Sequence, residues 1–81
     1  MFSFMPYHEI ERYLPTIIAN GVSEVARSKG QFLEQYKRYG ANLPQEWRIK
    51  RENFIKRHLA QYKVKPTPRR RLALIAWAYK V

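Results

Sequence analysis

The stretch PTPRRRLALIAWAYKV, residues 66–81, places three arginines directly before an uncharged apolar run. Thr67 is a favourable N-cap and Pro68 a favourable first helical residue, so the pattern predicts that the last helix begins there. Residues 72–81 are apolar on every side of that helix except at Lys80. Such a helix is typical of the centre of a core, and this one is too short to cross a bilayer. We therefore expect residues 72–81 to form the central core helix.

The rest of the chain has apolar residues at helical spacing and little that indicates strand. A first helix is expected, interrupted at Pro15 and weakened at Asn20 and Gly21. Ser28 is a candidate N-cap for a short helix, and residues 44–63 predict a longer helix that opens with a proline. The sequence thus predicts an all-α fold, a compact bundle of four to five short helices with the apolar C-terminal helix in the core.

The composition favours one small basic domain over residues 1–81. Aromatic residues make up 15% and apolar residues 46% of the chain, which is enough for a modest core and argues against disorder. Cysteine is absent, so we expect neither a disulfide nor a thiolate zinc site. No window is apolar over enough residues to span a bilayer, and Glu9 and Glu11 argue against a secretory signal. The expected location is the cytoplasm or the nucleoid.

The charge is strongly positive and unevenly distributed. The chain has 16 Lys and Arg against 6 Asp and Glu, a net charge of +10. Residues 44–81 contain eleven of these bases and two of the acids, whereas residues 1–43 contain five bases and four acids. An excess on one side favours a polyanionic partner, and nucleic acid is the commonest one.

The arginines of the opening stretch fall in the first turn of the last helix, where the helix dipole disfavours cations. Either solvent screens them, or an anion or the acids Glu46 and Glu52 neutralise them. First-turn N–H groups and three guanidinium groups would bind a phosphate, and we expect these arginines to contribute little to folding. The predicted nucleic-acid-binding residues are therefore the bases of the C-terminal half: Lys50, Lys56, Arg57, Lys63, Lys65, Arg69, Arg70 and Arg71.

Arg51 and His58 lie within the apolar arc of the long helix. A charge in that position must pair or extend to the surface, and a salt bridge to an N-terminal acid such as Glu34 is the favoured interpretation of Arg51. His58 is more typical of a packed or capping histidine than of a ligand. A functional role for either residue stays open at this point.

The stretch GVSEVARSKGQFLEQYKRYG, residues 21–40, partly matches a helix-turn-helix. Ala26 and Gly30 suit its small-residue and turn positions. Lys29 and Gln31, however, flank the glycine where apolar residues usually anchor the turn. If the second helix reads DNA, the groove contacts would be Gln31, Gln35, Lys37 and Arg38, which are the weaker candidates.

Catalysis has few residues to draw on. The chain has no Asp and no Cys, and none of its hydroxyl residues stands in a nucleophile motif. Its three glycines form no phosphate loop. His8 with Glu9 and Glu11 is weak as a metal site. We expect no enzyme activity, no metal and no cofactor.

The sequence therefore predicts a non-enzymatic nucleic-acid-binding protein that contacts phosphates, with DNA favoured over RNA and an accessory or regulatory role suited to its size. The alternative is a small adaptor or inhibitor that docks on an acidic protein. Its anchors would be Trp47, Tyr62 and Trp77, because aromatic residues dominate interface hot spots. Adsorption to an anionic membrane surface is the least favoured interpretation.

Overall fold

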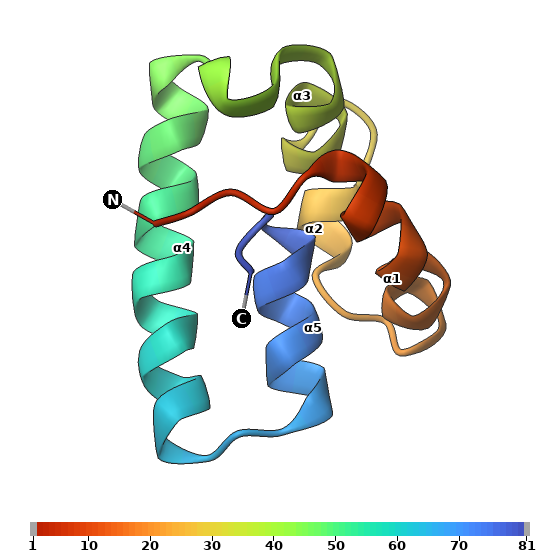
Figure 1. Ribbon diagram of the computed structural model, residues 1–81, viewed down its shortest axis with the longest axis vertical. Helices are drawn as coiled ribbons and strands as arrows, with labels where there is room; N and C mark the ends of the chain where they lie inside the picture. Colours follow the sequence, from red (N-terminus) through yellow and green to blue (C-terminus); the bar gives the residue numbers. More distant parts are fainter. Residues whose placement is uncertain (1, 81) are drawn as a thin grey trace.

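The computed structural model describes residues 2–80, and these residues form an all-α fold as the sequence predicts (Figure 1). Five α-helices and one 3-10 turn follow one another along the chain: α1 Tyr7–Ala19, α2 Glu24–Arg27, α3 Phe32–Tyr39, η1 Gly40–Asn42, α4 Gln45–Val64 and α5 Pro68–Ala76. The long helix predicted over residues 44–63 agrees with α4 to within a residue at either end.

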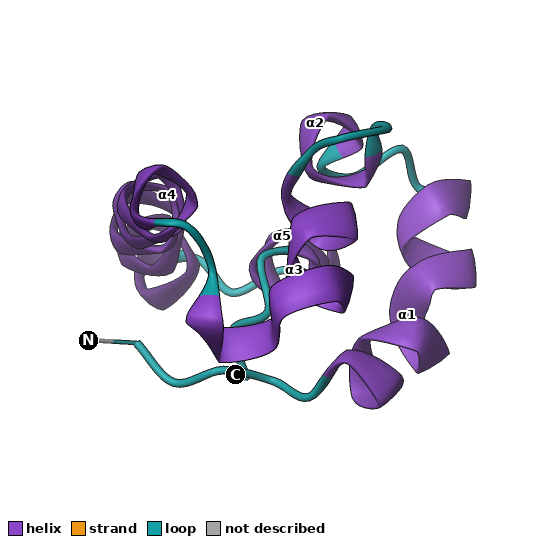
Figure 2. Cartoon of the chain, turned by 90° about the horizontal axis from the view of Figure 1, so that it is seen from above, coloured by secondary structure: helices purple, strands orange, loops and turns teal. Residues whose placement is uncertain are grey.

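The last helix, α5, lies at the centre of the bundle. Figures 1 and 2 both place α5 between α4 and α1, and it packs on both of them. Every residue from Leu72 to Ala78 is buried, which confirms the core prediction for this stretch. The Trp77 ring stacks on Phe32 at 4.7 Å and on Phe54 at 4.5 Å between centroids. The apolar tail therefore joins α3, α4 and α5 into one core.

The helical part of the tail is shorter than predicted, because α5 ends at Ala76. Trp77 is its C-cap, and Ala78 has a positive φ of 62°, a left-handed conformation that turns the chain away from the helix. Arg51 of α4 donates hydrogen bonds to the carbonyl oxygens of Trp77 and Ala78. The side chain of a neighbouring helix thus satisfies carbonyl groups that the end of a helix leaves without an internal partner. Residue 81 lies outside the described part.

Helix α1 continues through Pro15, so the predicted interruption is wrong. Proline removes one backbone donor from the helix. Pro15 is exposed, while Ile10 and Ile17 are completely buried on the inner face, and their packing holds the helix together across it. The helix ends where the sequence predicts that Asn20 and Gly21 weaken it, because α1 ends at Ala19 and Asn20 is its C-cap.

Ser28 does not cap the third helix as predicted. Its hydroxyl donates to the carbonyl of Glu24 at 2.8 Å, and Ser28 is the C-cap of the short helix α2. Helix α3 begins at Phe32 with Gln31 as its N-cap, and no side-chain hydrogen bond caps it. The Ser28 hydroxyl bonds to a carbonyl one turn earlier in the chain, and serine side chains commonly make this bond in place of an N-cap.

Candidate nucleic-acid interface

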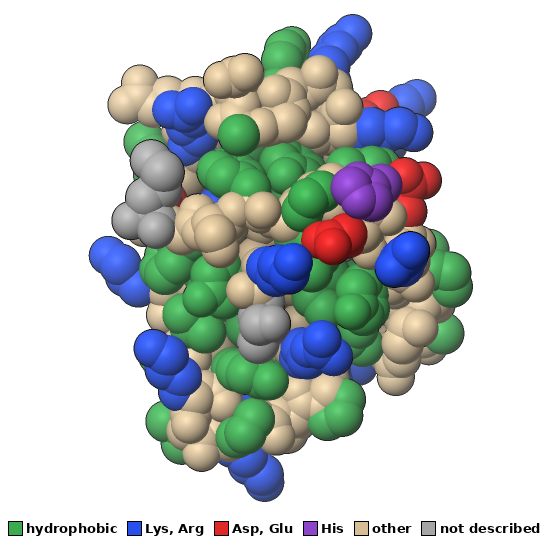
Figure 3. All heavy atoms as spheres, viewed as in Figure 1, with side chains coloured by type: hydrophobic (Ala, Val, Ile, Leu, Met, Phe, Trp, Pro, Cys, Tyr) green, Lys and Arg blue, Asp and Glu red, His purple; other side chains and the backbone are tan. Residues whose placement is uncertain are grey.

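The eight predicted contact residues lie on α4, on the linker after it and on the first turn of α5. All eight are exposed except Arg70, which is half-buried. Figure 3 shows Lys and Arg side chains projecting along the edge that α4 forms in Figure 1. The prominent acidic side chains of that face lie toward α1. Other Lys and Arg side chains project elsewhere on the face shown, so the view shows cations along the α4 edge without a strict separation of bases from acids.

Few of the basic side chains are neutralised within the described part of the chain. A single ion pair is found among residues 2–80, between Lys80 Nζ and Glu9 Oε1 at 3.9 Å. Neither Glu46 nor Glu52 pairs with the first-turn arginines, so that alternative is wrong. The positive charge of the α4 and α5 surface is left to solvent or to a partner.

The first-turn arginines do find partners, although these partners are not acids. Arg69 Nη1 donates to the carbonyl of Asn20 at the C-terminus of α1. Arg70 Nη1 donates to the carbonyls of Gln61 and Lys65, both at 2.9 Å, at the C-terminus of α4. Helix C-termini carry partial negative charge, which favours cations there. Two neighbouring helix ends thus offset the dipole conflict that we expected solvent or an anion to resolve.

The three arginines also diverge instead of converging on one phosphate. The Arg71 guanidinium lies over the ring of Tyr13, 5.8 Å from its centroid, and lines a small hollow beside Glu9. Arg69 and Arg70 line a different hollow. The single three-arginine phosphate site is therefore not present. The interface divides into Arg69 and Arg70 on one side of α5 and Arg71 on the other.

The hollow that Arg69 and Arg70 line lies between α4 and α5 and has a volume of roughly 370 Å³. His58 also lines it, and its ring stacks on Phe54 at 3.8 Å between centroids. Burial, and secondarily the charge of Arg57, lowers the pKa of His58 below 6.5. The neutral form therefore predominates at pH 7, and the side chain is packed against an aromatic ring, as the sequence favoured.

The α4 lysines occupy other parts of the surface. Lys56 and Lys63 border a shallow groove of roughly 290 Å³ whose floor includes Phe2 and Leu59. The Lys50 ammonium lies 4.7 Å from the ring centroid of Trp47, a distance typical of a cation–π contact. Both borders of the exposed side of α4 are therefore cationic.

Arg51 is the residue whose role the sequence did not resolve. It is only 1% exposed, and its guanidinium donates to four carbonyls: Trp77 at 2.8 Å, Ala78 at 2.9 Å, Ser3 at 2.6 Å and Phe2 at 3.3 Å. Burial lowers its pKa to about 10, so it stays charged at neutral pH. Arg51 thus ties both ends of the described chain to α4 and has a structural role.

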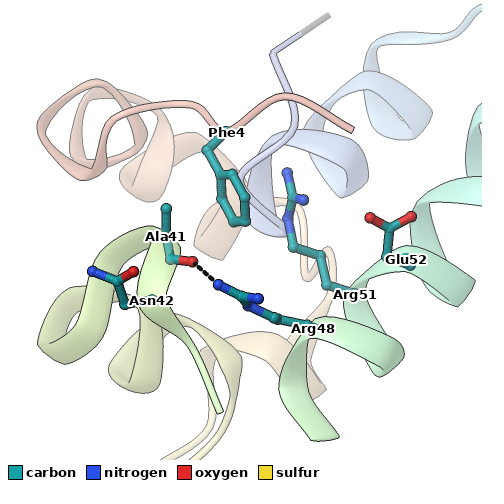
Figure 4. A pocket seen from close by; sticks show the side chains of 6 residues that line it. All are labelled: Phe4, Ala41, Asn42, Arg48, Arg51 and Glu52. Atoms are coloured by element: carbon teal, nitrogen blue, oxygen red, sulfur yellow. Dashed lines mark hydrogen bonds between the residues drawn. The ribbon is translucent and has the colours of Figure 1, made fainter. Parts of the chain in front are cut away.

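The predicted salt bridge from Arg51 to Glu34 is wrong. Glu34 instead accepts a hydrogen bond from the backbone N–H of Gly30, at the start of α3. The Arg51 guanidinium lies 3.9 Å from the ring centroid of Phe4, and both residues line a hollow of roughly 370 Å³ (Figure 4). Arg48 lines the same hollow and donates to the carbonyl of Ala41 at 3.0 Å (Figure 4).

The helix-turn-helix interpretation loses support in the structure. Its first helix would be α2, which has only four residues. Gln35 Nε2 donates to the Gly30 carbonyl at 3.4 Å, and the Lys37 ammonium lies 5.7 Å from the ring centroid of Tyr7. Gln31 is half-buried as the N-cap of α3, and Arg38 lies 5.9 Å from the ring of Tyr39. Gln35, Lys37 and Arg38 thus each contact a neighbouring group of the protein, although Lys37 and Arg38 remain exposed.

Two of the three anchors named for a protein-docking function lie inside the core. Trp77 is 5% and Trp47 8% exposed, while Tyr62 is half-buried.

Within residues 2–80, no group of three His or Glu side chains is placed to hold a metal ion. In the same range, no helix has both the length and the apolarity required to cross a membrane.

The fold and this surface define a small all-α domain with exposed cations on α4, on the linker after it and on the first turn of α5. Comparisons of the chain with models of protein families, with curated proteins and with solved structures find no match.

Proposed function

We propose that this protein is a non-enzymatic nucleic-acid-binding protein that contacts phosphates through the basic surface of α4 and α5. The observation that carries the proposal is the near absence of internal neutralisation. One ion pair, Lys80 with Glu9, is found among residues 2–80, against a net charge of +10. Exposed cations that few acids balance attract a polyanion.

The hydrogen bonds of the first-turn arginines are compatible with this function. Those recorded for the Arg69 and Arg70 side chains use Nη1 alone, and a guanidinium carries five N–H donors. The bonds to helix ends hold each guanidinium in place beside the hollow between α4 and α5. A held guanidinium with remaining donors loses less side-chain entropy when it contacts a phosphate.

Docking on an acidic protein is the second candidate. It would rely on the same cations, but the burial of Trp47 and Trp77 removes the anchors that would favour it. Only half-buried Tyr62 is left of the three.

An accessory or regulatory role in the cytoplasm or nucleoid accords with a domain of 81 residues.

The test is a titration of the full chain against duplex DNA, single-stranded DNA and structured RNA at several salt concentrations. If the proposal is correct, the logarithm of the binding constant should fall linearly with the logarithm of the salt concentration. On duplex DNA the slope should be about −0.9 for each phosphate contact. Absence of binding to all three nucleic acids at low salt would refute it. A stoichiometric complex with an acidic protein, under the same conditions, would then favour the second candidate.

A further inference from the structure

The side of α4 that faces away from the core is exposed. Figures 1 and 2 both place α4 at an edge of the molecule. Trp47, Arg51 and Ile55 are buried on its inner side. On its outer side Ile49 is 51% and Val64 85% exposed, although both side chains are large and apolar. The described residues therefore leave Ile49 and Val64 uncovered. Nearer the middle of α4, Phe2 of the N-terminal segment lines one groove with Lys56 and Ala60.

From Ile49 to Val64, a stripe without charged side chains runs along this outer face. At about 100° per residue, Ile49, Asn53, Ala60 and Val64 fall within an arc of about 60° around the helix axis. All four are exposed. Asn53 is the member of the stripe whose side chain carries hydrogen-bonding groups.

Two rows of cations border the stripe. Lys56 and Lys63 lie on one border, and Lys50 and Arg57 lie on the other. The residues within each row are seven apart, or about two turns of helix, and the rows are separated by about 120° around the axis. All four side chains are exposed, so each row is open to a partner.

Negative charge is absent along most of the stripe. Residues 53–64 contain no Asp or Glu. Glu46, in the first turn of α4, is exposed and falls at the same angle around the helix as Val64, so the N-terminal end of the stripe carries one carboxylate. Glu52 is half-buried where it lines the hollow beside Phe4 (Figure 4). A helix with cations on both borders and a neutral stripe between them is complementary to two parallel rows of anions with a less charged floor.

We infer that α4 lies in the major groove of duplex DNA, with the stripe toward the bases and each row of cations along one phosphate backbone. A helix is about 10–12 Å across, and the groove is about 12 Å wide. The major groove of duplex RNA is too narrow for a helix. This inference rests on the proposed function and goes beyond it, because it selects duplex DNA as the partner and α4 as the reading helix.

Asn53 reads an adenine in this arrangement. The amide of asparagine pairs with N6 and N7 of adenine in the major groove, and apolar side chains contact the thymine methyl group. Ile49 and Ala60 lie on either side of Asn53 in the stripe and would provide such contacts. Loss of one good bidentate contact lowers discrimination against the wrong base by roughly 5- to 150-fold.

The experiment selects bound duplexes from a randomised DNA pool with the full-length protein and then measures affinity for the selected sequence and its single-base variants. The parent should enrich a site that contains adenine and should bind it more tightly than duplex RNA. Asn53→Ala should lose the adenine preference roughly 5- to 150-fold while keeping its salt slope on unrelated DNA. Because Asn53 is exposed, the variant should keep the parent's thermal midpoint.

Two matched variants make the result decisive. Asn42→Ala removes an exposed asparagine that lies in η1, away from the stripe, and should keep the parent's preference. Gln35→Ala tests α3 as the reading helix. If Gln35→Ala loses the adenine preference and Asn53→Ala keeps it, the assignment to α4 is overturned. Salt-dependent duplex binding with no sequence preference, or tighter binding to RNA, would overturn the inference and leave the proposed function standing. Absence of any nucleic-acid binding would overturn both.

Discussion

Arg51 Nε on α4 donates a 2.8 Å hydrogen bond to the carbonyl oxygen of Trp77, the C-cap residue of α5. The same guanidinium reaches Ala78 and, across the N-terminal segment, Ser3 and Phe2. The N–H of Met5 adds a 2.7 Å bond to the Ala78 carbonyl. One buried cation thus holds both ends of the described chain on α4. The positive charge of this residue serves the fold, whereas the exposed cations are available to a partner.

Replacing Arg51 by Met should strongly destabilise the protein. Methionine is an apolar side chain of similar length and cannot donate these hydrogen bonds. The Ala78 carbonyl keeps the Met5 N–H, so up to three carbonyl groups lose their donor, at about 1–3 kcal/mol for each group that stays buried and unpaired. We expect a loss of at least about 3 kcal/mol in the free energy of unfolding, measured by urea denaturation. Arg48→Met is the control. Arg48 is exposed and donates to one carbonyl, so its loss should be below about 1 kcal/mol. Equal effects of the two substitutions would contradict the structural role of Arg51.

Replacing Trp77 by Ala should cost about 3–5 kcal/mol of stability, because the ring is 5% exposed and stacks on Phe32 and Phe54. Trp77→Phe should cost much less. The indole Nε1 is buried and has no hydrogen-bond partner among the described residues, so phenylalanine removes an unsatisfied donor while keeping an aromatic ring. Thermal melts of both variants check the order. A Trp77→Ala variant that melts like the parent would contradict the core position of this ring.

The pH dependence of stability should include a contribution from His58. Burial and the neighbouring Arg57 lower its pKa in the folded state, whereas the unfolded chain has the ordinary value of 6.5. The unfolded state therefore binds more protons as the pH falls below that value, and the free energy of unfolding should decrease toward acid pH. An NMR titration should place the His58 pKa below 6.5. His58→Gln should weaken this acid-side decrease, while His8→Gln, which replaces an exposed histidine, should retain it.

The sequence predicted those parts of the fold that depend on local chemistry. Thr67 accepts a hydrogen bond from the Arg70 N–H at 3.2 Å, as an N-cap should, and the apolar tail is buried because no side of it suits water. The interruption at Pro15 was wrong because the packing of Ile10 and Ile17 outweighs the loss of one backbone hydrogen bond. A prediction made from residues that are neighbours in the sequence does not include tertiary packing of this kind.

The candidate site shows the same limit. The positions of the exposed cations on α4 followed from helical periodicity alone, and Lys56, Lys63 and Arg57 are exposed as that periodicity requires. The partners of Arg51 and Arg70 could not be found in this way, because both donate to backbone carbonyls of other segments. Every residue carries a carbonyl, so no sequence pattern marks the one that an arginine will meet.

The first-turn arginines should separate into structural and binding contributions. Arg70→Gln removes a guanidinium that bonds to the Gln61 and Lys65 carbonyls, so it should lower stability by about 1 kcal/mol. Arg71→Gln should leave the thermal midpoint close to that of the parent, because Arg71 is exposed and contacts the edge of α1 through Tyr13. In titrations with duplex DNA, the substitution of an arginine that touches a phosphate should make the log–log salt slope shallower by up to about 0.9. Arg69 and Arg70 line one hollow, so the slope of the variant with both Arg69→Gln and Arg70→Gln should become shallower by up to twice that amount. Arg71 lines a different hollow, so the change in slope from Arg71→Gln should be independent of theirs. An unchanged slope in a folded variant would remove that arginine from the interface.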